Sequence, residues 1–331
     1  MELYSLDKNR IKENYNRILT LYNNSIETEE KIKLYYELRA LSRYIKKEKV
    51  SKNISQKEIN EYILKKREEK LKAQEDIKDL TIEICYSWCD SLRKLNEGNK
   101  TILQRKRITK EEYFSEINLF FETVMPSDKE LFDKTFKEQK ILVKRQLFLP
   151  RQEITFFESI KEYYIKVYYS NLNKIIVRNT IHEFGHASEF VKTGIGRSRD
   201  PLMEEVIATL YELLYIDMIF SNDEKSKLIE FSNLFKLIRL SPLENYIYQC
   251  CAKPDKLAET FYREINYMYT NIIALSIYLI KDKRNILEVI EYIKANTPYI
   301  KMHDILKNIG ITGEDLIYTA KNVKKLILDR G

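Results

Sequence analysis

The sequence predicts a mainly α-helical fold that carries one small β-hairpin. Only 7 Gly and 6 Pro interrupt a chain of 331 residues, in which Lys, Glu, Leu and Ile are abundant. Few helix-breaking and many helix-forming residues favour helices. Between residues 152 and 170, by contrast, β-branched and aromatic residues predominate, and these favour strands. We therefore expect helices before and after a short β element.

Residues 1–148 are predicted to form an N-terminal helical region. In LYYELRALSRYI (34–45) apolar side chains recur at helical spacing, and residues 59–92 continue as a long helical stretch. Breaks are expected at NEGNK (96–100) and MPSD (125–128), where turn-forming residues gather. Residues 149–331 form the second predicted region.

The second region is predicted to begin with a hairpin and continue with two helices. EITFF and EYYIKVYYS are the expected strands, and they are separated by the turn-like SIK. Residues 171–193 are expected to form one helix with Gly194 as its C-terminal cap. After the loop GIGRSRD, Asp200 is the expected N-cap of the next helix, with Pro201 at its first position.

The net charge of +7 leaves two readings open. Basic clusters that could contact nucleic acid or acidic peptides occur at Arg105, Lys106 and Arg107, and at Lys321, Lys324 and Lys325. Acidic residues are interleaved nearly everywhere, however, which favours a solvated helix surface. We expect no specific nucleic-acid partner.

The four cysteines do not predict a disulfide framework. Cys85 and Cys89 lie one helical turn apart, and Cys250 and Cys251 are adjacent, so neither pair has the spacing of a thiolate zinc knuckle. Buried thiols in a reducing compartment are expected. MELYSLDKNR contains no hydrophobic signal core, and the longest apolar run (272–280) is too short to span a bilayer. The sequence therefore predicts a cytoplasmic protein with no membrane partner.

The stretch NTIHEFGHASEF (179–190) contains two of the three histidines of the chain. Because His182 and His186 lie four residues apart, they stack on one helix face and can offer both imidazoles to one metal ion. Glu183 points about a quarter-turn away, where a general base can reach water held by the metal. Asn179 and Glu189 lie near the histidine face and could orient ligands. By chance alone the same pattern also occurs on ordinary helix surfaces.

Glu205 is the best candidate for a third metal ligand. On the helix predicted from residue 201 it lies opposite an apolar stripe, beside Ala208 and Thr209, whose small side chains would permit a close approach to the histidine helix. Two His and one Glu leave a position open for water, as a catalytic zinc site requires. His303 is far away in the sequence, and a structural or surface role is expected for it. Glu212 is either an outer-shell carboxylate or a solvated residue.

HEFGHA, with Glu205 nineteen residues after His186, resembles the M3 family of zinc oligopeptidases, and especially its oligoendopeptidase F branch. Segments 167–187, 261–278 and 303–327 are also similar to that family, so the resemblance covers about residues 150–331. It implies a gluzincin catalytic lobe that binds one Zn²⁺ ion per chain through His182, His186 and Glu205. Glu183 would then activate water.

The resemblance also implies that a tyrosine of the YMY stretch stabilises the tetrahedral intermediate. Tyr267 matches that donor best, and Tyr262 and Tyr269 are further substrate-side candidates. The family places a catalytic histidine shortly before its tyrosines, whereas Glu259 or Thr260 stands near that point here. The segment before the zinc motif is also shorter than in typical members.

The sequence thus predicts a zinc endopeptidase or oligopeptidase that hydrolyses short unstructured peptides as a monomer. The strand YYIKVYY could pair with an extended peptide substrate. The alternative is a catalytically weak or inactive relative that serves as a peptide- or partner-binding module. The missing histidine favours the alternative, and the intact Glu183 favours the enzyme.

Overall fold

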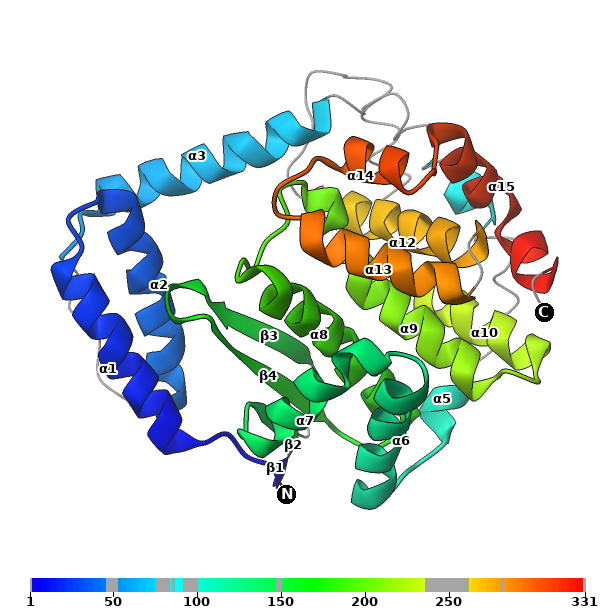
Figure 1. The fold of residues 1–331 in the computed structure, drawn as a ribbon, viewed down its shortest axis with the longest axis horizontal. Coiled ribbons are helices and arrows are strands. Elements are labelled where there is room, and N and C mark those ends of the chain that lie inside the picture. Colours follow the sequence, from blue (N-terminus) through cyan, green and yellow to red (C-terminus); the bar gives the residue numbers. More distant parts are fainter. Residues whose placement is uncertain are drawn as a thin grey trace.

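The computed structural model describes residues 2–45, 53–75, 84, 87–91, 101–146, 151–235, 262–280 and 283–329. Side chains are not described for 2, 67, 69–75, 201, 262–266, 280, 283, 284 and 327–329. Within the described ranges the chain is mainly helical with one small mixed sheet, as the sequence predicts (Figure 1).

The sheet contains four strands in the order β1-β2-β4-β3. Strands β3 (Gln152–Phe157) and β4 (Glu162–Tyr169) are antiparallel, so the predicted hairpin is confirmed. Strands β1 (Glu2–Tyr4) and β2 (Ile141–Arg145) were expected to be helical, and that expectation was wrong. Strand β2 pairs in parallel with β4, and β1 pairs with β2, so both depend on partners distant in sequence.

The two faces of β4 belong to two different cores. Tyr163, Ile165 and Val167 face the larger core, which also contains residues from α6 through α15. Tyr164 faces the smaller core, which it shares with helices α1 (Lys8–Asn24) and α2 (Thr28–Ile45). This alternation follows from the two-residue side-chain period of a strand. Residues on both sides of position 148 therefore share one sheet and one large core.

The remaining helices can be followed along the chain in Figure 1. Before the hairpin lie α3 (Gln56–Glu75), α5 (Ile102–Arg105), α6 (Lys110–Thr123), the 3₁₀ turn η1 (Pro126–Asp128) and α7 (Lys129–Lys137). After it come α8 (Lys174–Thr193), η3 (Pro201–Met203), α9 (Val206–Ile219), α10 (Glu224–Phe235), α12 (Tyr262–Ile280), α13 (Lys283–Asn296), α14 (Met302–Asn308) and α15 (Gly313–Asp329). The predicted break at MPSD is the short η1 turn, whereas NEGNK lies outside the described residues.

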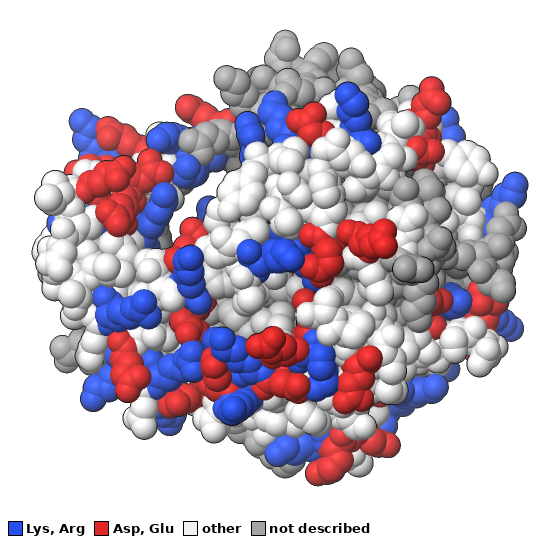
Figure 2. Space-filling model, viewed as in Figure 1, with Lys and Arg blue, Asp and Glu red and all other residues white. Residues whose placement is uncertain are grey.

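The surface in Figure 2 mixes acidic and basic side chains on the face it shows. An opening passes between helices α1–α3 and the rest of the molecule, and strand β3 borders it (Figures 1 and 2). Residues Arg105, Lys106 and Arg107 are exposed, as is Lys321.

Among the helices that the structure describes, none combines the length and apolar character needed to cross a membrane. Cys89 is buried, and the other three cysteines lie outside the described ranges.

Candidate metal centre

Helix α8 carries the two histidines and is held firmly at both ends. Asn173 caps it by accepting a hydrogen bond from the Ile176 amide at 3.3 Å, so the helix begins at Lys174 rather than at residue 171 as predicted. Gly194 ends it in the left-handed conformation with φ of 71°, as predicted. An L side chain is strained there, which explains the glycine.

One face of α8 is buried in the larger core. Val177, Ile181 and Phe184 are completely buried, and this fixes the rotation of the helix so that the histidines face the other way. Val191, by contrast, is 57% exposed. It lies in the last helical turn, where the neighbouring Lys192 is also exposed, so the burial ends before the helix does.

Helix α9 begins later than the sequence predicts. Asp200 does accept a hydrogen bond from the Leu202 amide at 3.0 Å, but it caps the 3₁₀ turn η3. The α-helix itself starts at Val206, with Glu205 at its N-cap position. Glu205 thus lies on the turn that joins the two elements, where its side chain can reach α8.

Helices α8 and α9 approach each other closely at Gly185. A Cβ atom at this position would lie 2.7 Å from the backbone Cα of Ala208. Such a contact is too short for real atoms, so the glycine between the two histidines is required by packing. The predicted close approach of the two helices at the small residues of α9 is therefore observed.

The three predicted ligands converge at this helix contact. The Nε2 atoms of His182 and His186 lie 3.2 Å and 3.1 Å from the same Oε2 atom of Glu205. Their ligand atoms all lie within 4.8 Å of one another. Two imidazoles and a carboxylate that converge in this way form a donor set suited to a catalytic zinc ion. His303 is exposed on α14, in agreement with the expected surface role, and it is not part of this cluster.

Glu212 occupies the position of an outer-shell partner. It is buried, and its Oε2 atom lies 3.1 Å from Nδ1 of His182. Its Oε1 atom lies 3.1 Å from Nε of Arg178, which holds the carboxylate in place. An Nδ1–H that donates to a carboxylate leaves the Nε2 lone pair for a metal, and this arrangement is typical of zinc-bound histidines. The reading of Glu212 as a solvated residue is excluded by its burial.

The electrostatics of the cluster follow from burial and from the shared carboxylates. Burial alone would lower the pKa of His182, but the charges and hydrogen bonds of Glu212 and Glu205 raise it well above its usual value. The pKa of His186 is also raised, because Glu205 outweighs the effect of burial. Burial raises the pKa of Glu205, yet the two imidazoles hold it well below its ordinary value. Protons on the rings thus balance the carboxylate charge at the positions where a metal ion would bind.

Glu183 lies beside this cluster and is only 6% exposed. Burial raises the pKa of its carboxyl group, and the nearby histidines only partly offset that effect. A carboxylate with a raised pKa is a stronger base, as general acid–base catalysis near neutral pH requires. The residue that follows the first histidine therefore has the environment of a general base.

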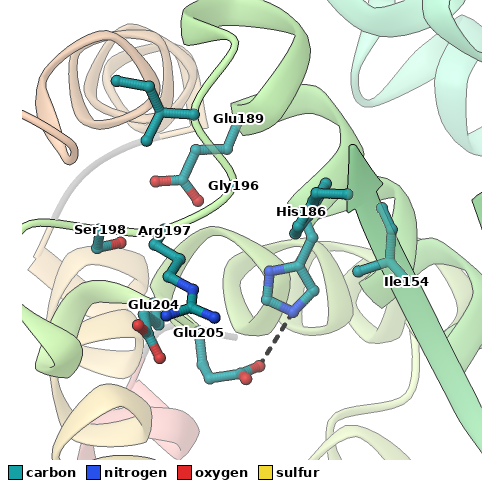
Figure 3. A pocket seen from close by; sticks show the side chains of 10 residues that line it. Ile154, His186, Glu189, Gly196, Arg197, Ser198, Glu204 and Glu205 are labelled. Atoms are coloured by element: carbon teal, nitrogen blue, oxygen red, sulfur yellow. Dashed lines mark hydrogen bonds and ion pairs between the residues drawn. The ribbon is translucent and has the colours of Figure 1, made fainter. Parts of the chain in front are cut away.

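A pocket of about 350 Å³ adjoins the cluster and shares His186 and Glu205 with it (Figure 3). It is lined further by Ile154, Phe156, Glu189, Ile195, Gly196, Arg197, Ser198 and Glu204. A volume in this range is typical of ligand pockets. Glu204 therefore borders the pocket, whereas its neighbour Glu205 joins the histidines.

Strand β3 forms one wall of this pocket and one edge of the described sheet. The Tyr168 amide donates to the Arg151 carbonyl at 2.8 Å, and hydrogen-bonded pairs alternate along an antiparallel ladder. By this alternation the backbone groups of Ile154 and Phe156 point away from β4, toward the free edge. Strand β4 was expected to bind the peptide, but it lies between β2 and β3 and has no free edge. The edges of the described sheet are β1 and β3, and β3 is the edge strand that lines the pocket.

A buried polar network fixes α8 and α9 relative to their surroundings. Oδ2 of Asp128 accepts hydrogen bonds from Ser188 on α8 at 2.9 Å and from Tyr211 on α9. It also pairs with Lys294 on α13 at 2.9 Å. Lys294 is almost completely buried, so this carboxylate joins three helices in a low-dielectric interior.

The structure describes the side chains of two of the three tyrosine candidates. Tyr267 is half-buried on α12, one turn before Thr270, whose hydroxyl donates to the Leu202 carbonyl of η3 at 2.9 Å. Tyr269 is completely buried in the larger core. The side chain of Tyr262 and all of Glu259 and Thr260 lie outside the described residues.

Asn179 contacts a different residue from the one expected. Its Oδ1 accepts a hydrogen bond from Arg178 at 3.1 Å rather than from a histidine. Sequence reasoning also missed Arg178, Ser198 and the pocket walls on β3. Arg178 lies one turn before His182, so its place near the histidines could have been noticed. The contribution of β3 depends on sheet pairing and has no local signal.

The fold, but not the sequence as a whole, can be related to known proteins. No protein-family model matches the chain, and no curated protein matches it. A Chlamydophila abortus structure provisionally named a peptidase is similar at a TM-score of 0.51 and 13% identity, over 99% of this chain and 65% of that one. At this identity the likeness shows the fold alone.

A Bacillus anthracis str. Ames structure provisionally named an oligoendopeptidase F gives a TM-score of 0.48 at 11% identity, over 91% of this chain and 61% of that one. The chain therefore spans less than two thirds of the length of either protein. The mainly helical fold with a small mixed sheet is shared with the Chlamydophila abortus structure.

Proposed function

We propose that this protein is a zinc-dependent peptidase that hydrolyses short, unstructured peptides. The observation that carries the proposal is the convergence of His182, His186 and Glu205 beside the buried carboxyl group of Glu183. The names of the structures with a similar fold agree with a peptidase activity. We expect one zinc ion per chain, because the cluster offers three candidate ligands, which would leave a fourth position open for water.

We assign each residue of the site a separate role in the reaction. A bound zinc ion supplies Lewis-acid chemistry, which makes water more acidic and polarises a carbonyl group. Glu183 takes a proton from the attacking water and passes it to the leaving amine. Glu212 orients His182 through Nδ1, so that Nε2 faces the cluster. Tyr267 is the proposed hydrogen-bond donor to the developing oxyanion, which is the role that the family resemblance implies.

The substrate is proposed to be an extended peptide. The free edge of β3 offers backbone donors and acceptors at Ile154 and Phe156, and both residues line the pocket beside the cluster. Pairing with such an edge requires an unfolded segment, because a folded substrate has already paired its backbone groups. This favours short or unstructured peptides over folded proteins.

The test is digestion of a mixed peptide library by the purified protein, with products identified by mass spectrometry. The matched control is Glu183→Gln, which removes the proton acceptor and no metal ligand. We expect its zinc content to remain and its turnover to fall by about two to four orders of magnitude. Equal cleavage by the parent and Glu183→Gln would show that another group, or a contaminating protease, performs the reaction.

The alternative function is peptide binding without efficient cleavage. The observation that favours it is the sequence AETFYREINY (258–267), which has no histidine where the resembled family places one. The same library distinguishes the two functions. A binding module would retain peptides on the immobilised parent protein and release them intact.

A further inference from the structure

The pocket beside the metal cluster contains a buried carboxyl group to which the proposed mechanism gives no role. Glu189 is 7% exposed and lies one helical turn after His186 on α8. Its Oε1 atom is buried and has no hydrogen-bond partner among the described residues. In Figure 3 the carboxyl group points from α8 into the pocket, toward the loop that carries Gly196 and Arg197. A buried carboxyl oxygen without a donor is costly, so a donor from a ligand would stabilise it.

A second unsatisfied polar atom lines the same pocket. The Oγ atom of Ser198 is also buried without a partner among the described residues. The loop that presents it is fixed, because the Gly196 amide donates to Glu158 at 2.8 Å and the Arg199 amide donates to the Thr297 carbonyl at 2.8 Å. The two polar atoms are therefore presented by a rigid helix and a tethered loop.

The charges around Glu189 favour a cation over an anion. Glu204 and Glu205 also line the pocket, and Arg197 is its only Lys or Arg residue. Figure 3 shows the Arg197 guanidinium directed toward Glu204 and Glu205 and away from Glu189. No Lys or Arg residue of the pocket lining therefore faces Glu189, and the imidazole of His186 offsets its negative charge only in part. Burial raises the pKa of Glu189 to about 7, because the hydrogen bond with Thr297 and the charge of His186 only partly offset its effect.

The size of the pocket fits a side chain or a chain terminus. A water molecule in the liquid takes roughly 30 Å³, so a pocket of about 350 Å³ is far larger than one ordered water requires. Ile154, Phe156 and Ile195 supply apolar walls that suit the methylene stem of a long side chain.

We propose that Glu189 and Ser198 form a subsite for a positively charged group of the peptide, namely a protonated amine or a guanidinium, next to the bond that is cleaved. This proposal rests on the proposed peptidase function for the position of the group, because the pocket shares His186 and Glu205 with the metal cluster. The group is supplied either by a Lys or Arg side chain or by the free amino terminus of a short peptide. The experiment below distinguishes these two sources.

The binding test uses zinc-loaded Glu183→Gln protein, which should hold peptides without cleaving them. The ligands are hexapeptides that differ at one central residue, Lys or norleucine, each with a free or an acetylated amino terminus. We expect calorimetry to show at least about tenfold tighter binding of the charged ligand, as a charge-assisted hydrogen bond predicts. A preference for Lys in acetylated peptides identifies the side chain, and a preference for the free terminus identifies the α-amino group.

Glu189→Gln keeps the shape of the side chain and removes its charge. The preference for the positively charged peptide should therefore disappear. The affinity for the norleucine peptide and the zinc content should stay constant. Ser198→Ala should reduce the preference several-fold, and it provides a second variant if Glu189→Gln fails to fold. The matched control is Glu122→Gln, an exposed carboxylate on α6 that should leave the preference intact.

The outcomes separate this proposal from the peptidase function. Cleavage of both peptides by the parent protein without any preference for a charged group would overturn the subsite and leave the peptidase intact. A preference that survives Glu189→Gln would also overturn it. Charge-selective binding that depends on Glu189, in a protein that cleaves no peptide, would support the subsite and reject the peptidase.

Discussion

At the scale of single residues, the ring of His182 lies between two carboxylates. Both of its ring nitrogens face carboxylates, Nδ1 toward Glu212 and Nε2 toward Glu205. A metal ion held at Nε2 would take the place of the proton there, so only the contact with Glu212 would remain a hydrogen bond. The contact with Glu212 then fixes both the tautomer and the orientation of the ring.

Glu212→Gln should therefore weaken zinc binding by roughly ten- to a hundredfold, because the outer-shell carboxylate is lost while all three ligands remain. The measurement is competition for zinc against a chelator of known affinity. Glu122→Gln is the matched control, since it makes the same change at an exposed carboxylate on α6. Equal zinc affinity of the parent and Glu212→Gln would show that Glu212 does not orient His182.

At the scale of the elements, the contact between α8 and α9 determines whether the ligands meet. Gly185→Ala would place a methyl group against the backbone of Ala208 and push the helices apart. We expect a loss of about 1–3 kcal/mol in the free energy of unfolding, as for other overpacked sites. Zinc affinity should fall as well, because Glu205 lies at the start of α9 and both histidines lie on α8.

Gly194→Ala provides the control for Gly185→Ala. It strains the left-handed cap at the end of α8 and should cost about 1 kcal/mol, but it leaves the contact with α9 unchanged. Chemical denaturation and zinc competition together separate the two effects. If both variants lose stability and neither loses zinc affinity, the packing at Gly185 does not position the ligands.

The sequence predicted those elements whose signals are local. The spacing of His182 and His186 on one helix, the glycine cap at Gly194 and the hairpin of β3 and β4 could all be inferred from neighbouring residues. The 3₁₀ turn before α9 could not, because Asp200 and Pro201 suit the start of either helix type. Strand β2 and the contacts of Asp128 depend on residues far away in the chain, and no local pattern indicates them.

At the scale of the whole molecule, the pH dependence of stability should reveal the histidine–carboxylate cluster. The pKa values of His182 and His186 are raised in the folded protein, so their stabilising effect is present below the usual pKa of about 6.5 and is lost as the pH rises through the raised values. The raised pKa of Glu189, about 7, acts in the same direction. The lowered pKa of Glu205 contributes stability above its ordinary value, which is lost in acid.

Protein stripped of metal should therefore lose thermal stability as the pH rises above about 6.5. Zinc should restore more stability at the higher pH, because the imidazoles no longer need to release protons to bind it. Differential scanning calorimetry with and without zinc measures both effects. A melting temperature of the stripped protein that rises across this range would contradict the charge arrangement described for the cluster.

The central claim is that one zinc ion binds to His182, His186 and Glu205, and metal analysis of purified protein tests it most directly. Parent protein dialysed against zinc and freed of excess metal should contain about one zinc ion per chain, as expected for a site with three protein ligands. The double variant His182→Ala, His186→Ala should contain almost none. A parent protein without zinc, or a double variant that retains a full equivalent, would contradict the account.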